Sequence, residues 1–345
     1  TFRSVLDRMK ETPDFVFSAS SACHYAWVEK VAPQLFEEVR ERVLEGRWCL
    51  VGGWWVEPDC NIPGGESFVR QGLYGQRYFK EKFGQMTRVG YNVDSFGHCG
   101  SLPQILKKQG MDSYIFLRPG PHEKGIPSRL FWWQAGDGSR VLAYRVPFEY
   151  TCWGDFLPRH IKNCAGELND SLENQMCFYG VGNHGGGPTV ENIQTIQILK
   201  GEDDLPELVF STPERYFEEI NAGERDLPVV QDDLQHHASG CYSAHSGIKR
   251  WNRQAENALI TAEKLATLAW QATGLAYPAP ELEHAWKQLL FTQFHDILAG
   301  TSLEETYEDA RVQIGEAISI AQRVLNDAVQ SLIWKIQVDE EPANQ

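Results

Sequence analysis

The stretch that decides the fold runs from residue 88 to residue 117 and is RVGYNVDSFGHCGSLPQILKKQGMDSYIFL. Arg88–Val93 and Ser113–Leu117 are short apolar runs typical of strands, and Leu102–Gln109 between them has helical periodicity. A strand, a helix and a second strand at this spacing predict a parallel pair with a crossover helix. Ligands of such folds bind at the carboxyl ends of the strands, where Asp94 directly follows the first one.

The same alternation extends outward on both sides, from the N-terminus to about residue 225. It predicts an α/β domain over residues 1–230 with a mostly parallel sheet or barrel. Further strands are predicted at Phe15–Ser18, Trp48–Val51, Met176–Val181 and Leu208–Phe210, and a hairpin at Leu130–Tyr144. Helices are predicted at Val31–Glu45, Ser67–Lys82, Val190–Lys200 and Pro213–Ile220.

The character of the sequence changes after about residue 250. Apolar residues then recur at helical spacing in three successive segments, which predicts a helical bundle domain over residues 231–338. Residues 339–345 are polar and acidic, and we expect them to be disordered. The chain begins at Thr1 inside a helical pattern, so we expect it to start within a longer protein.

Composition excludes several classes of function. The chain has 345 residues, with 32 Lys and Arg against 47 Asp and Glu, a formal net charge of −15. Such an acidic chain is poorly suited to nucleic acid or to an anionic membrane surface. It has no apolar run of membrane-spanning length. Its eight cysteines form no Cys-x-x-Cys pair, which favours free thiols in the reducing cytoplasm over a thiolate zinc cage.

Four segments carry residues suited to chemistry. Each also has a purely structural interpretation: Glu57 and Asp59 could be pocket acids or loop caps. His98 is expected to hydrogen-bond a backbone carbonyl. The side chains of His236 and His237 diverge, so at most one would serve a given metal site. The four segments are Gly52–Asp59, Tyr91–His98, Gly182–Thr189 and Phe294–Thr301.

Together, six motifs in this order resemble glycoside hydrolase family 38, the α-mannosidases. The resemblance implies a catalytic, distorted parallel β/α barrel followed by a three-helix bundle. Family members continue into β-sandwich domains after the bundle, so we expect the chain to be truncated at this end too. The motifs are GGWWVEPDCNIPGGESFVRQ (52–71), NVDSFGHCGSLPQILKKQGMD (92–112), FWWQAGDGSRVLAYR (131–145), GVGNHGGGPT (180–189), HHASGCYSAHSGIKRWNRQAE (236–256) and QFHDILAGTS (293–302).

The resemblance implies hydrolysis of terminal α-mannosides with retention of configuration. Retention requires a carboxylate nucleophile and a second group that acts as acid and then base. The family's nucleophile corresponds to Asp94, which would also bind a zinc ion. The second zinc ligand carries over to His295. Zinc is expected to hold sugar hydroxyls and so to assist ring distortion.

The resemblance also implies a set of substrate contacts. Asp296 would accept a hydrogen bond from a sugar hydroxyl, Phe96 would pack near the sugar ring, and Arg118 would steady the charge of the nucleophile. Trp55 and Asp59 complete the expected substrate-binding residues. The expected partner is an α-mannoside oligosaccharide. Members of the family often form oligomers, so a homo-oligomer is a candidate state.

Two departures from the family pattern stand out. The family's remaining zinc ligands come from a His-x-Asp motif on its first strand, and the sequence contains no such motif at its start. Many relatives carry an acidic residue where this chain has Asn183, whose amide is not a proton donor of the required kind. His184 or Asp233 could replace it, and the sequence does not decide between them.

Two other functions compete with the mannosidase. The first is a catalytically incomplete carbohydrate-binding fragment, which the missing zinc ligands favour. The second is a zinc-dependent polysaccharide deacetylase, because related barrels use Asp and His on zinc for that reaction. A deacetylase needs a His-x-x-x-His metal pair, which His236 and His237 do not supply.

Overall fold

The computed structural model describes residues 1–169, 172–182, 186–220 and 225–336. The chain divides into two compact units. Unit 1 consists of Thr1–Asn61 and Gln71–Ser239, and unit 2 of Ile62–Arg70 and Gly240–Gln345.

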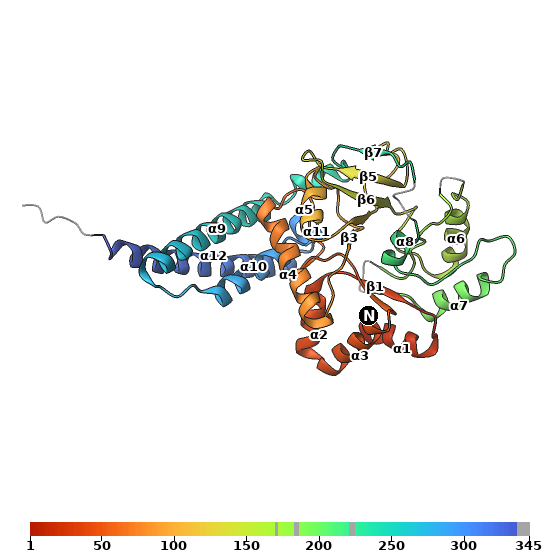
Figure 1. The fold of residues 1–345 in the computed structure, drawn as a ribbon, viewed down its shortest axis with the longest axis horizontal. Coiled ribbons are helices and arrows are strands. Elements are labelled where there is room, and N and C mark those ends of the chain that lie inside the picture. Colours follow the sequence, from red (N-terminus) through yellow and green to blue (C-terminus); the bar gives the residue numbers. More distant parts are fainter. Residues whose placement is uncertain (170–171, 183–185, 221–224, 337–345) are drawn as a thin grey trace, which may run out of the picture. The chain divides into compact units, whose positions relative to one another are not determined.

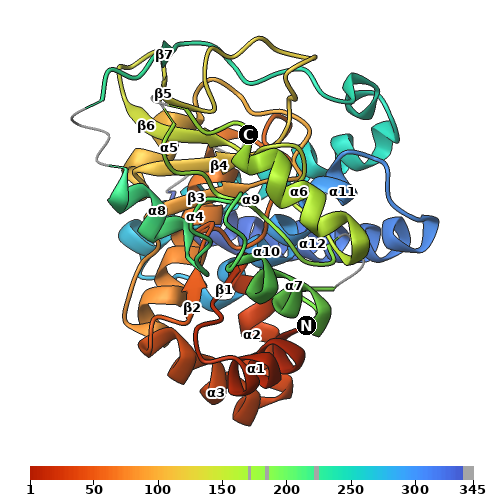
Figure 2. The same ribbon diagram turned by 90° about the vertical axis from the view of Figure 1, so that its right-hand side faces the viewer.

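Unit 1 is built on two sheets. Strands β1 (Phe17–Ala19) and β2 (Trp48–Leu50) form a parallel pair. The second sheet has the order β3-β4-β6-β5-β7, which Figure 2 shows from one side. In it β3, β4 and β6 run parallel, β5 is antiparallel to β6, and β7 is parallel to β5. These strands are β3 (Val89–Asn92), β4 (Ser113–Phe116), β5 (Leu130–Gln134), β6 (Arg140–Arg145) and β7 (Val229–Val230).

Helices connect and cover these strands. Where Thr212 precedes a proline, its hydroxyl accepts a hydrogen bond from the Arg215 amide at 3.2 Å and caps α8, as its sequence predicts. Helices α2 and α6 were not predicted. The helices of unit 1 are α1 (Phe2–Glu11), α2 (Ala22–Val31), α3 (Pro33–Leu44), α5 (Leu102–Lys108), α6 (Leu157–Ala165), α7 (Val190–Leu199) and α8 (Pro213–Glu219), with the larger part of α4 (Gly65–Phe83).

The central strands are buried on both faces, which explains their nearly continuous apolar sequences. Tyr114, Phe116, Phe131 and Trp133 from β4 and β5 are fully buried, and Trp133 donates from its indole nitrogen to the carbonyl of Asp232 at 2.8 Å. Burial of each such ring stabilises the fold by roughly 2–3 kcal/mol. The sheet is therefore a rigid support for the loops at its carboxyl edge.

Two predicted strands are wrong. Met176–Val181 and Leu208–Phe210 are not strands in the described structure, and only the isolated bridge between Cys152 and Gly180 pairs the first of them. The alternating apolar residues have another cause: Met176 and Phe178 pack against the apolar clusters beside the sheet. Apolar residues at alternating positions thus occur here in backbone that has no strand ladder. The mixed α/β class is confirmed, and closure of a barrel stays a prediction.

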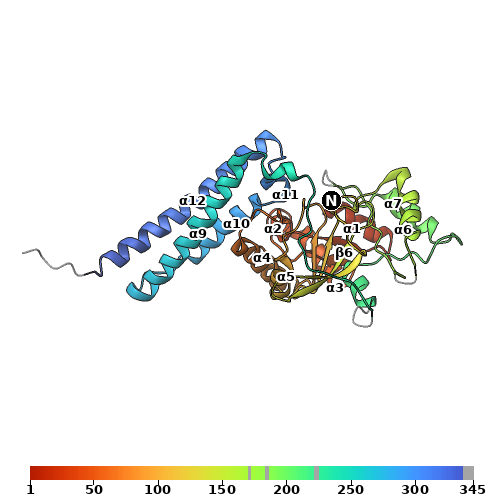
Figure 3. The same ribbon diagram turned by 90° about the horizontal axis from the view of Figure 1, so that it is seen from above.

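Unit 2 is helical. Its helices are α9 (Ser246–Thr273), α10 (Ala279–Thr292), the single turn α11 (His295–Leu298) and α12 (Glu304–Ile333). The three long helices contact one another, as Figures 1 and 3 show. Small residues at helical spacing, such as Ala262, Ala266 and Ala269, are buried in α9 and permit this close packing.

The segment Ile62–Arg70 belongs to unit 2 through one buried carboxylate. Glu256 of α9 accepts hydrogen bonds from the Gly64 amide at 2.8 Å and from the Ser67 hydroxyl at 2.6 Å. None of the helices in the described part of the chain combines the length and the apolar character that crossing a membrane requires.

Candidate active site

Four polar side chains gather at the carboxyl edge of the parallel strands in unit 1. Each comes from the loop that follows a strand: Glu57 after β2, Asp94 after β3, Arg118 after β4 and Tyr150 after β6. Asp94 and Arg118 were predicted as site residues. Glu57 was undecided between an acid and a cap, and Tyr150 was missed because nothing in its own sequence neighbourhood marks it.

Asp94 is fixed through both its side chain and its backbone. The Arg118 guanidinium forms an ion pair with the Asp94 carboxylate, and the same nitrogen, Nη1, donates to the Asp94 carbonyl at 3.3 Å. The Asp94 amide donates to Glu57 Oε1 at 3.1 Å. A carboxylate held this way is ionised and oriented, which suits a nucleophile. Glu57 thereby acts as a positioning residue for the Asp94 backbone.

Tyr150 supplies a second polar contact to the same carboxylate. Its hydroxyl hydrogen-bonds Asp94. Burial, reinforced by the negative charge of Asp94, raises the pKa of Tyr150 well above its usual range. The residue therefore remains a neutral phenol and donates to Asp94 throughout the physiological pH range.

His98 holds the backbone at Arg118 in place through a buried hydrogen bond. It is fully buried, its Nε2 donates to the Arg118 carbonyl at 2.9 Å, and its Nδ1 lies 2.8 Å from the Tyr114 hydroxyl. Because a carbonyl only accepts, Nε2 carries the proton and Nδ1 accepts from Tyr114. The expected hydrogen bond from His98 to a backbone carbonyl is confirmed, and it fixes the chain at Arg118.

The burial of His98 makes the stability of unit 1 pH-dependent. Desolvation lowers the pKa of His98 from 6.5 to about 3, so only the unfolded chain takes up a proton on this ring at mildly acidic pH. Its contribution is therefore fully present above pH 6.5 and declines as the pH falls toward 3. At about pH 5 we expect a loss of about 2 kcal/mol of unfolding free energy relative to neutral pH. Urea unfolding of the wild type and of His98→Gln at both pH values tests this, since the variant should lack this part of the pH dependence.

Phe96, His237 and Glu123 form a second group of side chains in unit 1. The His98 amide and carbonyl pair with those of Leu234 at 2.9 Å, which anchors the segment that contains His237. The Phe96 ring stacks on His237, with ring centroids 6.0 Å apart. His237 Nδ1 lies 2.6 Å from Glu123 Oε1. His237 is thus engaged by an aromatic ring and a carboxylate, and with Phe96 it forms an aromatic wall.

Asp233, one of the two candidate proton donors, lies in the same segment. Its carboxylate pairs with Lys124 at 3.0 Å, and Lys124 also contacts Asp232 at 2.8 Å. The other candidate, His184, lies outside the described residues, as does Asn183.

Trp55 and Asp59 belong to the loop that carries Glu57. Asp59 is fully buried, and its Oδ1 accepts from the Asn61 amide at 2.9 Å, so it stabilises a turn in this loop. The Trp55 amide donates to the Gln71 carbonyl at 2.9 Å, and its ring packs edge-on against Tyr78. The loop lies so close to α4 that a Cβ at Gly75 would come within 2.5 Å of the Gly53 carbonyl oxygen.

The two remaining predicted residues are neighbours in unit 2. His295 and Asp296 form the start of α11, directly after Phe294, whose ring lies 4.2 Å from the His295 ring between centroids. An imidazole and a carboxylate are both suitable ligands for zinc.

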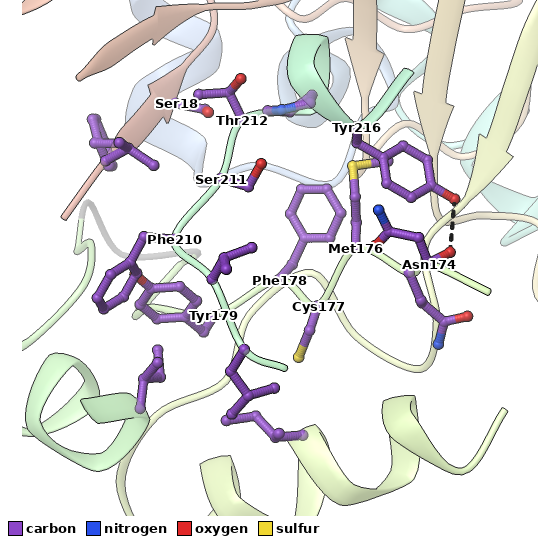
Figure 4. Close-up of a pocket in the computed structure, with 18 of the residues that line it drawn as sticks. Ser18, Asn174, Met176, Cys177, Phe178, Tyr179, Phe210, Ser211, Thr212 and Tyr216 are labelled. Carbon is purple, nitrogen blue, oxygen red and sulfur yellow. Dashed lines mark hydrogen bonds between the residues drawn. The ribbon is translucent and has the colours of Figure 1, made fainter. Parts of the chain in front are cut away.

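Unit 1 also contains a cavity of about 280 Å³, which aromatic, aliphatic and polar side chains line together. Figure 4 shows it between the Met176–Tyr179 segment and the Phe210–Thr212 segment, where the Tyr216 hydroxyl donates to the Asn174 carbonyl at 3.4 Å. Tyr150 lines the cavity and also contacts Asp94, so the cavity lies next to the residues around Asp94.

Comparisons with known proteins agree on one family. Residues 1–239 match the N-terminal domain of glycosyl hydrolases family 38, and residues 236–332 match the alpha mannosidase middle domain. Alpha-mannosidase G of Dictyostelium discoideum is 33% identical over 312 residues, which cover 90% of this chain and 29% of that protein. Human alpha-mannosidase 2C1 is 31% identical over 334 residues, which cover 95% of this chain and 32% of that protein.

The fold is also found in solved structures. The crystal structure of an alpha-mannosidase from Enterococcus faecalis V583 aligns with a TM-score of 0.85 at 22% identity, covering 99% of this chain and 40% of that one. The chain spans about a third of the length of the curated relatives it matches. The extent of the domain match and the identity to these relatives show that the chain belongs to glycosyl hydrolase family 38.

Proposed function

We propose that this chain carries the catalytic region of a retaining α-mannosidase, with Asp94 as the nucleophile. The observation that supports this most is the ion pair of Asp94 with Arg118 at the carboxyl edge of the parallel strands, reinforced by Tyr150. Relatives named α-mannosidases at 31–33% identity support the substrate class.

In the proposed mechanism, an Asp94 oxygen attacks the anomeric carbon while the glycosidic bond breaks. A proton donor protonates the leaving oxygen, so the aglycone departs as an alcohol. Water, deprotonated by the same group, then releases mannose and restores the carboxylate. Arg118 and Tyr150 keep Asp94 oriented through both steps, and Phe96 provides an apolar surface for the sugar ring.

The side chains expected at the metal site are of the types that bind zinc in proteins. Asp94 would supply a carboxylate oxygen and His295 an imidazole nitrogen, both common zinc ligands. When bound, zinc would polarise and hold sugar hydroxyls during ring distortion. Asp296 would then accept a hydrogen bond from a neighbouring hydroxyl.

Replacement of His295 by alanine is expected to lower both zinc content and activity. Loss of an imidazole ligand weakens metal binding, and turnover should fall by roughly 100-fold because substrate hydroxyls lose their anchor. Elemental mass spectrometry and aryl α-mannoside hydrolysis measure the two effects. His284→Ala, on exposed α10 surface beside Glu316, is the matched control. Unchanged zinc content in His295→Ala would remove this residue from the site.

The proton donor can be identified from leaving-group dependence. We propose His184 for this role, with Asp233 as the alternative. Loss of the donor should slow mannosides with poor leaving groups by about 10²–10⁴-fold and activated aryl mannosides far less. Kinetics of His184→Ala and Asp233→Asn on both substrate types distinguish them. If neither variant shows this selective loss, both assignments are wrong.

Two assays separate the competing functions. Release of mannose from an α-mannoside supports the glycosidase, whereas acetate release from an acetylated sugar would indicate a deacetylase. Binding of mannoside without either product would indicate a carbohydrate-binding fragment. The proposal includes a cytoplasmic location, which the eight free cysteines support, and a homo-oligomer as a candidate state that size-exclusion chromatography with light scattering tests.

A further inference from the structure

A group of three metal-ligating side chains lies in unit 1 and takes no part in the chemistry proposed for Asp94. His160 and Cys164 are one turn apart on α6, and Cys177 comes from the extended segment beside that helix. One ligand atom from each residue lies within 4.8 Å of the others. His160 and Cys164 are 7% and 3% exposed.

The distance between His160 and Cys164 is close to that between two ligands of one zinc ion. Zinc–sulfur bonds of about 2.3 Å and zinc–nitrogen bonds of about 2.0–2.1 Å place two ligands of one ion roughly 3.5–3.8 Å apart. His160 Nε2 and Cys164 Sγ are 3.9 Å apart. Only a small adjustment of side chains would therefore bring them into ligand positions.

Two hydrogen bonds from side chains to backbone carbonyls hold the two segments together in the absence of a metal. His160 Nε2 donates to the Phe178 carbonyl at 3.0 Å, and the Gln175 side chain donates to the Cys164 carbonyl at 3.0 Å. Figure 4 shows the Cys177 sulfur on the opposite side of its segment from Met176 and Phe178. The two apolar side chains face the core clusters, and the sulfur is left for the group on α6.

We propose that His160, Cys164 and Cys177 bind a thiophilic divalent cation, with zinc the best fit to two sulfurs and one nitrogen. The site is separate from Asp94 and does not depend on the proposed mannosidase activity. The two cysteines come from different segments of the chain, so no Cys-x-x-Cys pair marks the site. The ion would fasten the 174–179 segment, which has no strand ladder of its own, to α6.

Binding has a defined proton balance. The two thiols lose their protons to solvent when the metal–sulfur bonds form. His160 Nε2 gives up its hydrogen bond to the Phe178 carbonyl and binds the metal. The ring proton of His160 then resides on Nδ1. Affinity should accordingly rise with pH.

Cobalt(II) is the probe that tests this site. We expect the chelator-treated chain to bind about one equivalent that produces sulfur-to-cobalt charge-transfer absorption in the near ultraviolet, and zinc to abolish it. Asp94 and His295 contain no sulfur, so Asp94→Asn and His295→Ala should keep the band. Cys164→Ser and Cys177→Ser should lose it, and Cys99→Ser, a partly exposed thiol elsewhere in unit 1, should retain it.

The spectrum of the wild-type chain is decisive by itself, so the test does not depend on whether the variants fold. Absence of the band contradicts the site, as does a band that persists in the Cys164→Ser/Cys177→Ser double variant. A Cys164–Cys177 disulfide found by peptide mass spectrometry in the chain purified under reducing conditions would also contradict it. Circular dichroism of each variant confirms that lost absorption reflects lost ligands.

Discussion

Replacement of Asp94 by asparagine is expected to lower kcat/KM for aryl α-mannosides by roughly 1000-fold or more. The amide has nearly the same shape, but it is neutral and a poor nucleophile, so the covalent step is lost. The Arg118 ion pair disappears with the charge. Initial-rate kinetics with a sensitive fluorogenic mannoside measure the residual activity.

The matched control for this change is Asp112→Asn. Asp112 precedes β4 at the opposite end of the strands and pairs with Arg88 at 2.6 Å on the surface. It should keep wild-type kinetics, because an exposed ion pair contributes little to stability. Asp94→Asn with near-normal turnover and a normal circular dichroism spectrum would show that another residue is the nucleophile.

Replacement of Arg118 by alanine should also lower kcat/KM strongly, by about 100-fold. Removing one partner of a partly buried, hydrogen-bonded charge pair costs about 2–5 kcal/mol, and each 1.4 kcal/mol is a factor of ten. Asp94 would keep its contact with Tyr150 and the hydrogen bond from its amide to Glu57. Its carboxylate would lose orientation in the transition state, so most of the effect should fall on kcat.

Two comparisons make the Arg118 result specific. Arg118→Lys retains a positive charge without the planar fork and should lose less activity than the alanine variant. Arg88→Ala removes an exposed guanidinium that pairs with Asp112 and should leave kinetics unchanged. A loss confined to KM in Arg118→Ala would instead assign this residue to substrate binding.

The position of Asp94 could be predicted because it depends on local pattern alone. A strand period ends just before it, and the parallel strand–helix–strand unit determines which edge it reaches. Arg118 follows the next strand for the same reason. His98 could be assigned to a backbone carbonyl because a buried imidazole requires a partner, although the partner's identity, Arg118, required the structure.

The remaining features depend on contacts between distant segments. Tyr150 lies in an irregular loop after β6, and its approach to Asp94 is set by the course of that loop. Met176 and Phe178 pack against the clusters beside the sheet without forming a strand, so apolar residues at alternating positions led to a wrong strand. His160 and Cys164 lie on a helix, whereas Cys177 lies in a segment more than ten residues further along the chain. No short sequence motif contains all three residues.

The most direct test of the account is to trap the covalent intermediate. A fluorinated α-mannosyl fluoride reacts with retaining enzymes but leaves the glycosyl-enzyme slowly, so the labelled protein accumulates. After digestion, peptide mass spectrometry should find one mannosyl group on the peptide that contains Asp94, and fragmentation should place it on that carboxylate. Turnover without any label, or a label on Glu57 or another residue, would contradict the assignment of Asp94 as the nucleophile.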